Sequence, residues 1–191
     1  MSEIQALSAK RLLITGAAGM LGSALTTVLS RAVPACQVTA LSHAQLDVTD
    51  GDAVMAAAAY QPDIIIHCAA KVDADYCEKN PDQCYDVMVN GTRHVTELAK
   101  RCNAQVCYPQ SFLVYDGKTL PITQTTVPAP LSVYGKNKWQ AEQLLRAELP
   151  DSLIVRMGGF FGGGAIDKNF VGKFAQALKK NISQGIRTIE V

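Results

Sequence analysis

The chain has 191 residues, of which 48% are apolar and only 18% charged, so it is long enough for a folded core and unlike a disordered protein. Lys and Arg number 18 against 17 Asp and Glu, and a net charge of +1 gives no case for nucleic acid or an anionic membrane as a partner. The N-terminus lacks the pattern of a signal peptide, and no apolar run approaches about 20 residues, so we expect a cytoplasmic protein outside the membrane.

Short apolar runs alternate with longer segments of helical spacing along the whole chain. In chain order, the expected elements are strand 11–15, helix 20–32, strand 36–42, helix 49–61, strand 62–70, helix 81–102, strand 104–112, helix 132–145, strand 152–162, helix 170–180 and strand 186–191. This alternation predicts an α/β fold, a doubly wound parallel sheet of Rossmann type with helices on both faces. Ligands of such sheets bind beyond the carboxyl ends of the strands.

The cysteines do not follow the spacing of a metal site or a redox motif. No two of them form a CxxC pair, and no pair of histidines completes a zinc pattern, so we expect no metal. One of them lies inside the apolar run DIIIHCAA. Reduced and buried thiols are therefore the favoured interpretation for Cys36, Cys68, Cys77, Cys84, Cys102 and Cys107.

A glycine cluster follows the first predicted strand and opens the first predicted helix. Gly16, Gly19 and Gly22 have the spacing GxxGxxG. The first glycine permits a tight turn, the second a close approach of the backbone to a pyrophosphate, and the third close packing of helix and strand. Met20 and Leu21 lie in the first turn of that helix, where the N-terminus adds partial positive charge. The cluster predicts a dinucleotide site.

The end of the second strand bears on the choice of dinucleotide. An Asp or Glu that would bind the ribose of NAD is absent there, and Ser42 and His43 stand at the turn instead. Both side chains can hydrogen-bond a phosphate, which favours NADP and leaves NAD as the alternative. Asp47, a few residues later, either accepts a hydrogen bond from the adenine amino group or simply caps a turn.

Tyr134 and Lys138 stand one helical turn apart within SVYGKNKWQAEQLL. A tyrosine pKa is about 10, too high for easy proton transfer near neutral pH, and a nearby ammonium would lower it. Taken alone, YxxxK is more typical of a solvated helix face. Ser111, however, ends the strand before it, where a hydroxyl can donate to a carbonyl oxygen that gains charge. Together with the glycine cluster, the three residues favour an oxidoreductase site.

Several stretches in this order resemble the extended short-chain dehydrogenases/reductases: TGAAGMLG, HCAA, VMVNGT, Ser111 and YGKNK. Within that superfamily the chain is most similar to the dTDP-4-dehydrorhamnose reductases, through LDVTD, QPDIIIHCAAKVDADYCE, SFLVYDG and VRMGGFFGGG. The resemblance implies that residues 1–160 form a Rossmann domain. It also implies that residues 161–191 begin a substrate-binding lobe, which is incomplete where the chain stops at Val191.

The resemblance also implies roles for individual residues. Ser111 would orient a substrate carbonyl, Tyr134 would protonate it, and Lys138 would bind the nicotinamide ribose and lower the pKa of the tyrosine. Asn90 would help hold Lys138 through the helix backbone and a water, although beside a glycine it also reads as a residue that breaks the helix. The implied cofactor contacts are Gly16, Gly19, Met20, Leu21, Gly22, Ser42, His43, Asp47, Val48, Ala69, Ala70, Lys71, Tyr134 and Lys138.

The implied reaction is the NAD(P)H-dependent reduction of a 4-keto group on a nucleotide-linked deoxysugar. Phe112 and Leu113 depart from the family, which has Asp and Tyr after the catalytic hydroxyl, and this leaves the sugar open. The implied alternatives are a non-catalytic NADP-binding regulatory subunit, as in the methionine adenosyltransferase β subunit, and an NAD-dependent sugar-nucleotide epimerase or dehydratase. A homodimer, or a partner chain that supplies the missing lobe, is the expected assembly.

Overall fold

The computed structural model describes residue 7 and residues 9–162 and 170–184 of the chain. Contacts divide the chain between Gly158 and Gly159 into two compact units. The first unit holds the whole sheet and all predicted site residues, and the second holds helix α7 (Phe170–Ser183). The assignment of residues 161–191 to a substrate-binding lobe stays a prediction.

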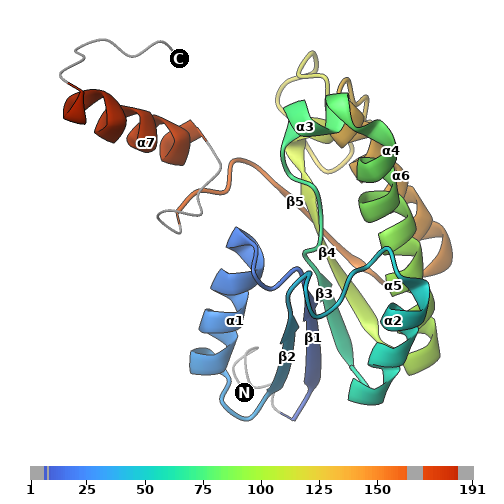
Figure 1. The fold of residues 1–191 in the computed structure, drawn as a ribbon. Helices are drawn as coiled ribbons and strands as arrows, with labels where there is room; N and C mark the ends of the chain where they lie inside the picture. The colour runs from blue at the N-terminus through green and yellow to red at the C-terminus, as the bar shows by residue number, and fades with distance from the viewer. Residues whose placement is uncertain (1–6, 8, 163–169, 185–191) are drawn as a thin grey trace. The chain divides into compact units, whose positions relative to one another are not determined.

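Five parallel strands form one sheet in the order β2-β1-β3-β4-β5, as Figure 1 shows. Leu13 pairs with Thr39 on one side and with Ile65 on the other, which places β1 beside both β2 and β3. The predicted doubly wound parallel sheet is confirmed, and the predicted strand 186–191 lies outside the described residues. The strands are β1 (Arg11–Thr15), β2 (Gln37–Leu41), β3 (Ile64–His67), β4 (Gln105–Ser111) and β5 (Leu153–Met157).

Helices cover both faces of this sheet (Figure 1). The remaining helices are α1 (Met20–Ala32), α2 (Gly51–Ala56), α3 (Ala74–Lys79), α4 (Pro81–Tyr85), α5 (Gly91–Cys102) and α6 (Val133–Glu148). Helix α1 packs Leu25 and Leu29 against Ile14 on one face. Helices α5 and α6 pack Leu98 and Leu145 into the larger core on the other. Successive side chains of a strand point to opposite faces, so each apolar strand serves both cores.

Three helical segments differ from their predictions. The predicted helix 49–61 is α2 followed by a 3-10 turn (Ala57–Tyr60), because Pro62 disfavours helical backbone just before it. The predicted helix 81–102 is α4 and α5 joined by a π-helical turn (Asp86–Asn90), a feature that is frequent at functional sites. Helix α3 was missed, although its N-cap Asp73 accepts a hydrogen bond from the Tyr76 backbone N–H.

All six thiols are unpaired, in agreement with the predicted reduced state. Burial is confirmed only for Cys77 and Cys84, and the other four are half-buried. Within the described ranges, no helix has the length and apolar character needed to cross a membrane.

Candidate active site

The glycine cluster forms a tight turn between β1 and α1. Gly16 has a φ of +66°, and a Cβ added to it would lie 2.7 Å from the Ala69 backbone nitrogen, so only glycine fits both the conformation and the space. A Cβ on Gly22 would lie 2.8 Å from the Ala17 Cα, so this glycine lets α1 start directly against the turn. The predicted contact residues Gly16 and Ala69 are thus brought together at the carboxyl ends of β1 and β3.

The first turn of α1 fits an anionic group. Gly19 is its N-cap, and among the described residues no side chain caps this end and no acidic side chain lies in the first turn. The backbone N–H groups of Met20 and Leu21 can therefore donate hydrogen bonds to a phosphate, and the helix dipole adds to the attraction. A cradle lined by glycines and an N-terminus of this kind fit the pyrophosphate of a dinucleotide.

The turn after β2 is held by its own side chains. The Ser42 hydroxyl donates to Gln45 Oε1 at 2.8 Å, and His43 Nδ1 lies 3.8 Å from Asp47 Oδ1. Asp47 Oδ1 accepts from the backbone N–H and the hydroxyl of Thr49, which holds the pKa of Asp47 below its ordinary value. The turn-capping alternative for Asp47 is realised, while the contacts of Ser42, His43 and Asp47 with a dinucleotide stay predictions.

Val48 packs inward against the start of α5. It is buried, and a Cβ on Gly91 would lie 2.6 Å from its Cγ2, which explains why a glycine stands at the start of α5. Its carbonyl oxygen lies 2.8 Å from His94 Nδ1. The contact between Val48 and an adenine stays a prediction.

Two further predicted contacts follow Ala69 after β3. Ala70 packs against the small apolar cluster that contains Tyr134, and the exposed Lys71 places its ammonium 5.6 Å from the centroid of the Tyr76 ring. Ala69 and Ala70 therefore link the glycine turn to the predicted proton donor.

Ser111 and Tyr134 come together at the carboxyl end of β4. Burial raises the pKa of Tyr134 above its ordinary value, and the nearby Ser111 side chain counteracts part of that effect. The Ser111 Oγ also accepts from the Leu113 backbone N–H at 3.2 Å. Helix α6 approaches this loop closely, since a Cβ on Gly135 would overlap the Leu113 carbonyl oxygen. Of the four predicted catalytic residues, Ser111 and Tyr134 thus lie close together.

The structure directs the Lys138 side chain to other partners than Tyr134, and the predicted lowering of the Tyr134 pKa by Lys138 stays a prediction. Its side chain is buried, and its ammonium donates to the Pro109 carbonyl oxygen at 2.6 Å and lies 3.7 Å from the centroid of the Tyr108 ring. Burial lowers the pKa of Lys138 to about 7, against the attraction of Cys68 and Glu142. At neutral pH the lysine therefore carries only part of a full charge, which weakens its pull on the phenol.

Asn90 ends the π-helical turn on the helix that faces α6. Its Nδ2 donates to Asp86 Oδ1 at 2.9 Å, and its Oδ1 accepts from Arg93 at 3.2 Å. Lys138 is held by Pro109 instead, so the predicted support of Lys138 by Asn90 stays a prediction. Asn90 does not break the helix, because backbone helical geometry continues through Gly91.

His67 is a site residue that sequence reasoning missed. It is buried at the end of β3, its Nδ1 lies 2.7 Å from Thr15 Oγ1, and its Nε2 lies 3.2 Å from Thr92 Oγ1. The Thr92 hydroxyl donates to Met88 O, so it accepts from Nε2–H, and the Thr15 hydroxyl donates to Nδ1. Thr15 in turn accepts from the Ala69 N–H. Neutral His67 thus anchors the wall of the glycine cradle, a role that a single buried histidine in an apolar run does not signal.

Acid is expected to destabilise the protein through His67. Burial, with the Lys138 charge, lowers the pKa of His67 from 6.5 to about 3, so the unfolded chain binds more protons between these values. The free energy of unfolding should fall by about 3 kcal/mol as pH drops from 6.5 to 4. Urea unfolding measures the free energy of unfolding at each pH from 4 to 7. In a His67→Asn variant this free energy should fall less steeply with decreasing pH than in the unchanged protein. Equal slopes in the two proteins would contradict the role of His67.

Comparison with known proteins places this geometry in a family. The model of the RmlD substrate binding domain family matches residues 10–186. A dTDP-4-dehydrorhamnose reductase from Aggregatibacter actinomycetemcomitans is 36% identical over 173 residues, which are 90% of this chain and 58% of the relative. Methionine adenosyltransferase 2 subunit beta from Rattus norvegicus is 29% identical over 80% of this chain and 48% of the relative.

The fold has the same relatives among solved structures. The crystal structure of a dTDP-4-dehydrorhamnose reductase from Bacillus anthracis in complex with NADP is similar with a TM-score of 0.80 and 29% identity, over 90% of this chain and 60% of that one. The chain thus spans about three fifths of the length of the reductases that it matches.

Proposed function

Because the chain belongs to the RmlD substrate binding domain family, within the extended short-chain dehydrogenases/reductases, we propose that it acts in the NAD(P)H-dependent reduction of a 4-keto group on a nucleotide-linked deoxysugar. The observation that carries this proposal is that Tyr134 packs in one cluster with Leu113, in the turn that directly follows Ser111 at the carboxyl edge of the sheet. The glycine cradle lies at the same edge, where sheets of this class bind their ligands.

Each side chain has a defined task in this reaction. The Ser111 hydroxyl would donate a hydrogen bond to the substrate carbonyl oxygen as that oxygen gains negative charge. The Tyr134 hydroxyl would transfer its proton to the same oxygen, which is feasible because the Ser111 side chain lies close enough to affect the pKa of Tyr134. The reduced nicotinamide of the bound cofactor supplies the hydride. Lys138 lies one turn of α6 from Tyr134, where it would bind the nicotinamide ribose.

We propose NADP as the cofactor, with NAD as the alternative. Gly16, Gly22 and the first turn of α1 would hold the pyrophosphate. Ser42 and His43 would hydrogen-bond a 2′-phosphate, at the expense of the contacts that they make with Gln45 and Asp47. The NADP complex of the related Bacillus anthracis reductase supports this choice.

The proposal is tested by a Tyr134→Phe variant. This variant keeps the ring but loses the proton, so we expect unchanged binding of NADPH and a loss of reductase activity toward a dTDP-4-keto sugar of about 100-fold or more. Binding is measured by the fluorescence of the reduced nicotinamide, and activity by its loss of absorbance. Full activity of the variant would overturn the role of Tyr134, and failure of the unchanged protein to bind NADPH would overturn the proposal.

A second candidate function is that of a non-catalytic NADP-binding subunit. It is supported by the similarity to methionine adenosyltransferase 2 subunit beta over 80% of this chain. The presence of Ser111, Tyr134 and Lys138 in the chain favours the reductase. A chain that binds NADPH but shows no reduction of keto sugars, with or without Tyr134, would favour the second candidate.

A further inference from the structure

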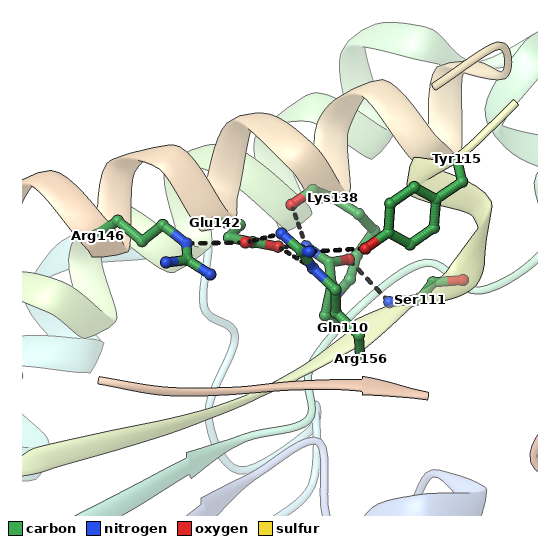
Figure 2. A network of polar contacts seen from close by, with 7 residues as sticks. All are labelled: Gln110, Ser111, Tyr115, Lys138, Glu142, Arg146 and Arg156. Atoms are coloured by element: carbon green, nitrogen blue, oxygen red, sulfur yellow. Dashed lines mark hydrogen bonds and ion pairs between the residues drawn. The ribbon is translucent and has the colours of Figure 1, made fainter. Parts of the chain in front are cut away.

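A buried polar network joins the end of β4 to the middle of α6 (Figure 2). Its centre is Gln110, which is 1% exposed and directly precedes Ser111. The Gln110 Nε2 donates to the Lys138 carbonyl oxygen at 3.0 Å and to Glu142 Oε2 at 2.8 Å, and the Gln110 Oε1 accepts from the Ser111 backbone N–H at 2.8 Å. One side chain therefore binds the backbone of two residues of the proposed catalytic group.

Glu142 fixes which way this amide points. Its side chain is fully buried, and it accepts hydrogen bonds from Arg146 and Arg156 as well as from Gln110. Those bonds hold the pKa of Glu142 below its ordinary value even though burial alone would raise it. A flipped Gln110 amide would direct its oxygen at the Glu142 carboxylate and the Lys138 carbonyl and its nitrogen at the Ser111 N–H. All three contacts would then be repulsive, so a single orientation remains.

Arg156 extends the network to the far side of the Ser111 loop. This residue of β5 donates from Nη2 to Glu142 Oε1 at 2.5 Å and from Nη1 to the Tyr115 hydroxyl at 2.6 Å. Tyr115 follows directly on the 3-10 turn Phe112–Val114, which begins just after Ser111. The loop that carries Ser111 is thus held before it by Gln110 and after it by Tyr115, and Figure 2 shows both attachments meeting at Glu142.

The location of this network argues for a role beyond stability. A buried charged group of this kind is often no better for stability than apolar side chains of the same volume. A set of hydrogen bonds, in contrast, fixes the distance and the angle between the elements that it joins. Here the joined elements are the strand that carries Ser111 and the helix turn that carries Lys138, whose ammonium also reaches back to Pro109 on that strand.

We propose that Gln110 is a positioning residue that sets the placement of Ser111 relative to Lys138, with Glu142 and Arg156 orienting its amide. This inference rests on the proposed function, because it gives a purpose to the placement of those two side chains. Gln110 is buried, and its side chain bonds the backbone of Lys138 and Ser111, so it acts through the backbone of its neighbours.

The test is a Gln110→Met variant, which keeps the volume and removes all three hydrogen bonds. Loss of the tie to the Lys138 carbonyl should let the ammonium leave Pro109 for solvent, so that its titration midpoint rises by about one unit. The midpoint is measured on the chain without cofactor, from the pH dependence of Lys138 acylation read by mass spectrometry. His67, Cys68, Tyr108 and Glu142, the other groups that face this ammonium, are unchanged in the variant.

Two controls separate positioning from general destabilisation. Gln140→Met makes the same chemical change at an exposed position of α6, where the side chain bonds only the Tyr85 hydroxyl at 3.3 Å among the described residues. Val54→Ala truncates a buried side chain on α2, outside the network, and lowers stability without touching it. Both should leave the Lys138 midpoint unchanged. If the titration midpoint of Lys138 in the Gln110→Met variant equals its midpoint in the two control variants, the inference is overturned.

NADPH affinity gives a second measure of the same placement. We expect Gln110→Met to weaken NADPH binding about tenfold, and neither control to do so. If the unchanged protein binds no NADPH, the proposed function fails, whereas the Lys138 midpoint still decides the inference about Gln110. The two failures are therefore distinguishable.

A reciprocal exchange keeps the inference testable if Gln110→Met does not fold. Gln110→Glu retains the shape but offers no N–H to Lys138 O and faces the Glu142 carboxylate. Adding Glu142→Gln restores a donor and acceptor pair between the two positions and leaves one carboxylate in the network, while the tie to the Lys138 carbonyl oxygen stays broken. The double variant should therefore keep a raised Lys138 midpoint. A midpoint equal to that of the unchanged protein would count against the inference.

Discussion

Glu142→Ala is expected to lower the free energy of unfolding by about 3–5 kcal/mol. The substitution leaves the half-buried Arg156 and the buried Gln110 without their shared acceptor, and a buried cation without its partner is costly. Urea unfolding at pH 7 measures the change. A decrease in the free energy of unfolding of less than about 1 kcal/mol would show that water replaces the carboxylate. The network would then contribute little to stability.

Glu148→Ala on the same helix is the matched control. Glu148 pairs with Lys100 at 2.5 Å, but both side chains are more than one-third exposed, so this surface ion pair should be worth less than about 1 kcal/mol. Because the pKa of Glu142 is lowered in the folded state, its stabilisation is present above the unfolded pKa and is lost as pH falls through the folded value. The difference in the free energy of unfolding between the Glu142→Ala and Glu148→Ala variants should therefore become smaller in acid.

The sequence was sufficient for the framework of the fold. Strand 11–15 and helix 20–32 match β1 and α1 residue for residue, because apolar runs and helical spacing are local signals. The predicted boundaries of helices differ from the structure where tertiary contacts determine them. The π-helical turn Asp86–Asn90 lies where Gly91 packs on Val48, a contact between residues 43 positions apart that no window of the sequence contains.

The candidate site was predictable as a set of residue types but not as a set of interactions. The spacing of Tyr134 and Lys138 correctly indicated one helix, and Ser111 lies at the end of β4 as the strand pattern indicated. The direction of the Lys138 side chain was not encoded in that spacing, since the choice between the phenol and the Pro109 carbonyl depends on how β4 lies under α6. For the same reason Gln110 carried no signal, because a glutamine in a strand becomes informative only when its three partners are known.

Lys138→Met is expected to stabilise the protein at pH 7 by about 2–4 kcal/mol while it weakens NADPH binding. The pKa of Lys138 is 10.5 in its ordinary state and about 7 in the folded chain, so the unfolded chain binds more protons between those values. The contribution of Lys138 to the free energy of unfolding should rise with pH from 7 to 10.5, and this contribution should be absent in the variant. The hydrogen bond to Pro109 and the contact with the Tyr108 ring offset only part of the burial cost, which sets the lower end of the range.

Lys136→Met is the control for this experiment, because Lys136 is exposed on the same helix and should change neither stability nor its pH dependence by more than about 0.5 kcal/mol. Urea unfolding from pH 6 to 10 compares the three proteins. Equal stability of the Lys138→Met variant and the unchanged protein across this range would mean that the ammonium is as well solvated in the fold as in water. A gain in stability together with weaker NADPH binding would instead show that Lys138 contributes to cofactor binding although it lowers the stability of the fold.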